Sequence, residues 1–112
     1  MTAFGYINAI YSLLTYGVSF TIRRAAGRPD PVAVSIELTN LCNLNCPNCA
    51  TGSGMLERPK GFMNIETAAK ISEWIKNSSM TANLYFQGEP MLHPCFFEII
   101  DIFRPLHGVI ST

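Results

Sequence analysis

Residues 32–49 read VAVSIELTNLCNLNCPNC, which joins a strand pattern to three closely spaced cysteines. Apolar side chains occupy every second position of its first half, and smaller or polar ones lie between them. This period of two predicts a β-strand over residues 32–38 with one face committed to a core. The composition then shifts to Asn, Gly, Pro, Ser and Cys, so residues 39–62 are expected to form a long, functional loop.

Cys42, Cys46 and Cys49 lie within eight residues of that loop. The sequence has no evident secretory signal, so a reducing, cytoplasmic setting is expected, in which clustered thiols are more often metal ligands than disulfides. Three thiolates suit an iron–sulfur cluster or zinc. A zinc site would need a fourth ligand, such as His93 or Cys95. The spacing is not the paired CxxC usual for zinc, and we favour the cluster.

The rest of the chain predicts an α/β order with parallel strands and crossover helices. Asn64 can cap a helix that runs to about Asn77, whose packing face is expected to hold Ile65, Ala68, Ile71, Ser72 and Ile75. A second strand is expected over residues 82–87. Gly88-Glu89-Pro90 ends that strand. Pro94 begins a helix that runs through Phe103, and residues 109–112 form a third strand. Residues 1–31 are a helix and linker, and residues 32–112 are the start of the main domain.

The first 22 residues carry no charged side chain and predict a helix. It has a polar row at helical spacing, made of Asn8, Ser12, Thr15 and Ser19. The helix should pack through an apolar row made of Phe4, Ile7, Tyr11, Leu14, Val18 and Ile22, so an amphipathic surface helix is favoured over a membrane span. Contact with a membrane surface remains an alternative. Eight acidic residues balance eight basic ones, so no nucleic-acid partner is predicted.

The cysteine spacing, its position after a strand, and Gly88-Glu89-Pro90 after the next strand together resemble the radical S-adenosylmethionine (radical SAM) enzymes. The resemblance implies that Cys42, Cys46 and Cys49 bind a [4Fe–4S] cluster whose fourth iron takes the amino and carboxylate groups of SAM. It also implies that Gly88, Glu89 and Pro90 contact the methionine amino group. The residue before the third cysteine is often bulky in this family and packs near the adenine, but here it is Asn48.

The family fold implied is a parallel (β/α) partial barrel, of which this chain supplies about two βα units. The expected protein is therefore the N-terminal part of a radical SAM core domain, an oxidoreductase-type enzyme that cleaves SAM to a 5′-deoxyadenosyl radical. Its partners would be SAM, an unidentified small-molecule or peptide substrate, and an electron donor such as flavodoxin or ferredoxin. The alternatives are a non-enzymatic zinc or iron–sulfur module and an inactive truncated fragment.

Overall fold

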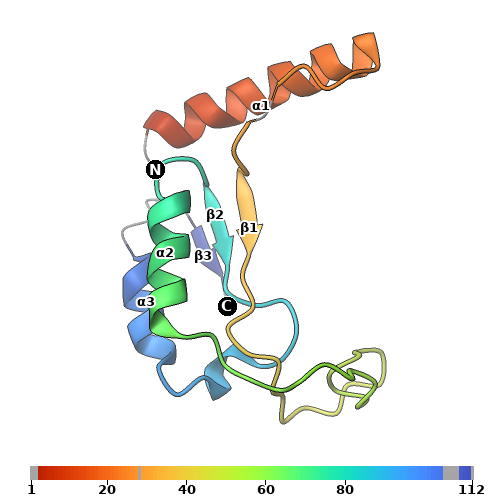
Figure 1. Cartoon of the computed structure of the whole chain (residues 1–112), viewed down its shortest axis with the longest axis vertical. Helices are drawn as coiled ribbons and strands as arrows, with labels where there is room; N and C mark the ends of the chain where they lie inside the picture. The colour runs from red at the N-terminus through yellow and green to blue at the C-terminus, as the bar shows by residue number, and fades with distance from the viewer. Residues whose placement is uncertain (1–2, 28, 105–108, 112) are drawn as a thin grey trace.

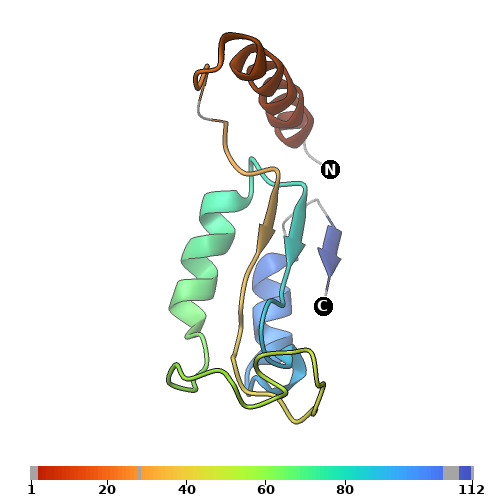
Figure 2. The same ribbon diagram turned by 90° about the vertical axis from the view of Figure 1, so that its right-hand side faces the viewer.

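A three-stranded parallel sheet is the centre of the fold (Figures 1 and 2). The computed structural model describes residues 3–27, 29–104 and 109–111. The strands β1 (Ala33–Ser35), β2 (Thr81–Asn83) and β3 (Val109–Ser111) lie in the order β1-β2-β3. Val34 pairs with Ala82, and Ala82 with Ile110. All three strands therefore end at the same edge of the sheet.

Two helices, α2 (Ile65–Ile75) and α3 (Phe96–Phe103), connect the strands and pack against each other. Both cover the same face of the sheet (Figure 2), as right-handed crossovers between neighbouring parallel strands require. One core fills the space between the two layers. Its buried members are Ile36, Leu38, Ala68, Ile75, Ala82, Leu84, Phe96, Ile99 and Phe103. The expected α/β class with parallel strands is confirmed, and this arrangement is compatible with part of a radical SAM domain.

The start and the buried face of α2 agree with the sequence prediction. Asn64 is its N-cap, and its side-chain oxygen accepts a hydrogen bond from the backbone N–H of Thr67 at 2.8 Å. This bond satisfies one of the N–H groups that a helix leaves unpaired at its start. Ser72, on the buried face, donates to the carbonyl oxygen of Ile102 at 2.9 Å and so joins α2 to α3.

The strands are shorter than predicted. β1 covers only part of residues 32–38, because after Ile36 the backbone no longer forms hydrogen bonds with β2. The N–H of Ile36 still donates to Asn83 of β2, whereas the carbonyl of Leu38 accepts from Met63 in the returning loop. β2 likewise ends at Asn83, four residues before the predicted end. Burial nevertheless keeps the predicted alternation, since Ile36 and Leu38 belong to the core.

The helix predicted from Pro94 begins later. Cys95 is the N-cap of α3, which starts at Phe96. Pro90 instead occupies the first turn of a short 3₁₀ helix, η1 (Pro90–Leu92), that the sequence pattern did not indicate. The predicted third strand is present as β3, while its last predicted residue, Thr112, lies outside the described residues.

The N-terminal helix α1 (Ala3–Ile22) forms as predicted but packs through its polar row instead of its apolar row. The predicted apolar row is exposed, and the polar row faces the chain that follows the helix. The physical reason is backbone hydrogen bonding: Asn8 donates to the carbonyl oxygens of Asp30 and Ser78, each at 3.0 Å, and Ser19 accepts from the N–H of Ala26 at 2.8 Å. Among the described residues, no helix has the length and apolar content needed to cross a membrane.

Candidate functional site

The two predicted motifs meet at the edge where β1 and β2 end. The backbone N–H of Glu89 donates to the carbonyl oxygen of Leu41 at 2.7 Å. Leu41 immediately precedes Cys42, so this bond joins the Gly88-Glu89-Pro90 turn to the beginning of the cysteine run. The carboxyl ends of parallel strands are where binding sites in α/β folds gather.

Gly88 permits this close approach. Its φ is +78°, a region that side chains disfavour. A Cβ atom at this position would also lie 2.7 Å from the carbonyl oxygen of Leu41 and still nearer to that of Thr39. Gly88 therefore allows the turn to lie directly against the backbone of residues 39–41.

Glu89 and Pro90 form the start of η1. One carboxylate oxygen of Glu89 accepts from the N–H of Met91 at 3.2 Å, so part of this side chain caps the 3₁₀ helix. A cavity of about 330 Å³ opens beside this turn. Its lining residues are Tyr85, Gly88, Glu89, Pro90 and Met91.

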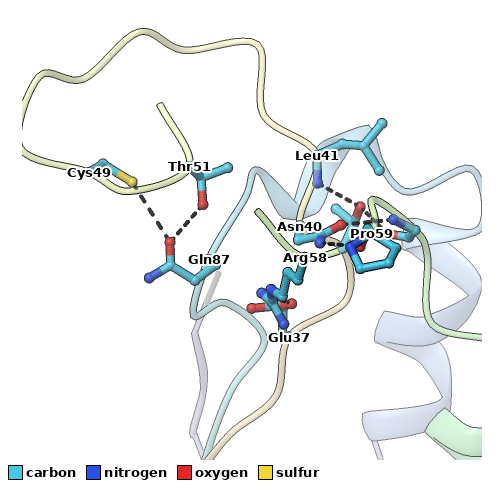
Figure 3. Close-up of polar contacts among 10 residues, drawn as sticks. Glu37, Asn40, Leu41, Cys49, Thr51, Arg58, Pro59 and Gln87 are labelled. Atoms are coloured by element: carbon cyan, nitrogen blue, oxygen red, sulfur yellow. Dashed lines mark hydrogen bonds and ion pairs between the residues drawn. The ribbon is translucent and has the colours of Figure 1, made fainter. Parts of the chain in front are cut away.

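The base of the cysteine loop is closed by two buried polar residues that the sequence analysis did not single out. Asn40 donates to the carbonyl oxygen of Pro59 and accepts from the N–H of Gly61, both at 2.8 Å. Thr39 donates to the carbonyl oxygen of Gly61 at 2.7 Å. These bonds hold the two ends of the loop together (Figure 3). A polar pair directly after an apolar strand was the only sequence signal that could have indicated them.

Within the loop, the chain folds back on itself around Cys46. The N–H of Cys49 donates to the carbonyl oxygen of Cys46 at 3.1 Å. Gly52 lies so close that a Cβ atom there would be 2.7 Å from the backbone nitrogen of Cys46. Cys42 accepts a hydrogen bond at its sulfur from the N–H of Leu44, with the two atoms 3.4 Å apart.

The surroundings of Cys49 favour its thiolate. Backbone N–H groups of Gly52 and Thr51 donate to its sulfur and lower the pKa of the thiol, because hydrogen bonds to a charged form stabilise that form. A thiolate is the form of cysteine that binds metals.

Gln87 is a further residue at this site that the sequence analysis missed. Its side-chain oxygen accepts from the hydroxyl of Thr51 at 2.6 Å and lies 4.0 Å from the sulfur of Cys49. Thr51 and Cys49 both point toward it from the loop (Figure 3). Gln87 therefore connects the far end of the cysteine run to the segment that follows β2.

Replacing Gln87 with alanine should loosen this connection without unfolding the chain. The short hydrogen bond from Thr51 and the long one from Cys49 are lost at a partly exposed site, so the free energy of unfolding should fall by only about 1 kcal/mol. The backbone amides of Ser53 and Gly54 should exchange with solvent deuterium faster, as read by amide hydrogen exchange. Gln87→Glu keeps an acceptor for Thr51 and should preserve the slow exchange; equal acceleration in both variants would contradict this role.

The structure does not bring the predicted ligands into one metal-binding group. The described part of the chain contains no set of three or more His, Cys, Asp or Glu side chains placed to hold a metal ion. Cys42 and Cys49 are half-buried, whereas Cys46 and Asn48 are exposed. The donor chemistry nevertheless fits an iron–sulfur cluster, since three free cysteines lie on one loop that is fixed mainly at its base. Their assignment as ligands stays a prediction.

His93, one of the two candidates for the fourth ligand of a zinc site, has both ring nitrogens engaged. It is buried, and its Nδ1 accepts from the N–H of Cys95 at 3.0 Å. That bond puts the ring proton on Nε2, which donates to the carbonyl oxygen of Met63 at 2.8 Å. Both ring nitrogens are therefore occupied by structural hydrogen bonds.

Comparison with known proteins gives partial and distant similarities. No protein-family model matches the chain. The chain is 29% identical over 75 residues to the mycofactocin maturases of Mycobacterium ulcerans and Mycobacterium tuberculosis, which covers 67% of this chain and 20% and 19% of those proteins. It is 33% identical over 89 residues to the pre-heme d1 synthase of Dinoroseobacter shibae, which covers 80% of this chain and 22% of that protein.

The chain thus spans about a fifth of the length of the curated relatives that it matches. Both kinds of relative are radical SAM enzymes. This similarity is independent of the local geometry, and it agrees with the resemblance carried by the cysteine spacing. Together they support the radical SAM superfamily as the group of enzymes to which this chain is related.

Proposed function

We propose that this chain is part of a radical SAM enzyme, in which Cys42, Cys46 and Cys49 bind a [4Fe–4S] cluster and leave one iron open for SAM. Residues 32–112 would be the start of the core domain, preceded by an appended helix and linker. When bound, the cluster supplies the electron that cleaves SAM to a 5′-deoxyadenosyl radical, which removes a hydrogen atom from the substrate. The proposed setting is the cytoplasm, with flavodoxin or ferredoxin as the electron donor.

The observation that carries the proposal is the hydrogen bond between Glu89 and Leu41. It fixes the Gly88-Glu89-Pro90 turn beside the residue that leads into Cys42, so a ligand held at one motif is within reach of the other. Carbonyl and carboxylate oxygens of the turn are suited to accept hydrogen bonds from an ammonium group such as that of the methionine part of SAM.

The residues of the loop have separate roles in this proposal. The backbone N–H groups around Cys49 stabilise its thiolate before a metal binds. Thr39 and Asn40 hold the loop ends, so that closing the loop around a cluster leaves the strands in place. Asn48, exposed between the second and third cysteines, would offer an amide where other members offer a bulky side chain to the adenine.

SAM binding and cleavage test this function. The chain is reconstituted anaerobically with iron and sulfide and reduced with dithionite, and its EPR spectrum is recorded with and without SAM. We expect SAM to change the cluster signal and 5′-deoxyadenosine to form. Cys95→Ser should behave like the wild type, because Cys95 lies outside the loop. A cluster signal that does not respond to SAM would instead favour a non-enzymatic electron-transfer module.

A further inference from the structure

The helix α1 exposes an apolar surface that is unusual in its breadth. Eleven of its 20 residues are large apolar or aromatic side chains that are 46–77% exposed. Leu13 and Phe20 are among the most exposed, at 71% and 77%. An exposed apolar surface of this extent indicates a site that binds a membrane or another protein surface.

The polar side of α1 is only half-exposed, because it is turned toward the chain itself. Asn8 on this side bonds the backbone of Asp30 and Ser78, and Ser19 bonds the backbone of Ala26. Gly5 is buried on the same side, and Gly27 lies within contact distance of Tyr11 and Thr15. A helix that packs on one protein partner normally presents one apolar stripe and keeps its polar stripe in solvent. In α1 the polar stripe instead forms hydrogen bonds with the backbone of the same chain. The exposed sides of the helix carry mainly apolar side chains.

The distribution of charge near α1 favours a lipid surface over a second protein as its binding partner. The first 29 residues contain three arginines and no acidic residue, although the whole chain is neutral. Arg23 and Arg24 follow the helix directly and are exposed, and the described residues place no ion pair on either. An uncharged apolar helix next to free arginines is complementary to an anionic bilayer, where the apolar side chains enter the acyl boundary and the arginines meet lipid phosphates.

The position of α1 is compatible with such a contact. The helix lies at the end of the sheet where the strands begin, whereas the cysteine loop lies at the opposite end (Figure 1). A surface bound through α1 would therefore leave the cysteine loop facing away from the lipid. The helix is not suited to cross the bilayer, so it would lie along the interface.

We propose that α1 docks the protein on an anionic lipid bilayer, with its exposed apolar side chains in the interface and Arg23 and Arg24 against phosphate groups. The fluid acyl boundary would receive a broad apolar surface of the helix at once, which a single flat protein surface cannot do. This proposal does not depend on the cluster or on SAM.

Vesicle flotation of the 112-residue chain tests the proposal. The chain is mixed with vesicles of phosphatidylcholine alone or with added phosphatidylglycerol, and partitioning is measured at low and high salt. We expect flotation with the anionic vesicles, weakened by salt. The double variant Leu13→Glu/Phe20→Glu should partition less by on the order of a hundredfold. Arg23→Gln/Arg24→Gln should lower binding to anionic vesicles by roughly tenfold.

Phe97→Glu is the matched control. Phe97 is 78% exposed, close to the 77% of Phe20, but it lies on α3, so this variant should float like the wild type. Equal loss in Phe97→Glu and in the α1 variant, or no flotation of the wild type, would overturn the proposal. Sedimentation that shows a dimer in solution, dissociated by the α1 variant, without vesicle binding would overturn it in favour of a second copy of the chain.

Discussion

Replacing Gly88 with alanine should lower the free energy of unfolding by about 3 kcal/mol. Two effects add at this position. The φ of +78° is unfavourable for a residue with a Cβ atom, and the new atom would press on the carbonyl oxygens of Thr39 and Leu41. Because these are backbone atoms, relief requires the Gly88 turn to move away from residues 39–41. Urea unfolding followed by the fluorescence of Trp74 measures the loss.

Gly54→Ala is the control that separates the two effects. Gly54 has a φ of +75°, close to that of Gly88, but a Cβ atom there meets nothing within 4 Å. Its replacement should cost only about 1 kcal/mol. Equal losses in the two variants would mean that the contact between Gly88 and residues 39–41 contributes nothing to stability.

Replacing Asn40 with alanine should have a comparable effect, a loss of about 3 kcal/mol. Asn40 is buried, and its amide satisfies the carbonyl of Pro59 and the N–H of Gly61. Alanine leaves both groups without this partner and opens the base of the cysteine loop. In addition to urea unfolding, the amide of Gly61 should lose its protection from hydrogen exchange.

Asn64→Ala provides the comparison for Asn40. It removes the same side chain from an exposed hydrogen bond at the start of α2, and we expect a loss of about 1 kcal/mol. Gly61 should stay protected in this variant. If Asn64→Ala destabilised the chain as much as Asn40→Ala, the closure of the loop base would not be the cause.

The elements governed by local pattern could be predicted from the sequence. Asn64 as a helix cap, the buried face of α2 and the alternation at Ile36 and Leu38 depend on nearest neighbours and on a periodic pattern. The length of β1 could not be predicted, because its pairing ends where Leu38 takes Met63 as a partner from the returning loop.

Long-range hydrogen bonds explain the remaining differences. The orientation of α1 depends on carbonyl groups of Asp30 and Ser78, which the helix sequence does not reveal. Asn40 and Gln87 are ordinary polar residues in the sequence and acquire their roles only when the loop folds back. For the candidate site, the three cysteine ligands stay a prediction from the sequence, and the structure adds the contact that joins the two motifs.

The metal content of the anaerobically reconstituted chain tests the central claim most directly. Iron, acid-labile sulfide and zinc are measured in the wild type, in Cys95→Ser and in a variant with serine at Cys42, Cys46 and Cys49. We predict about four irons per chain in the first two proteins and none in the third. Stoichiometric zinc without iron in the wild type, or iron that persists when the three loop thiols are removed, would contradict the account.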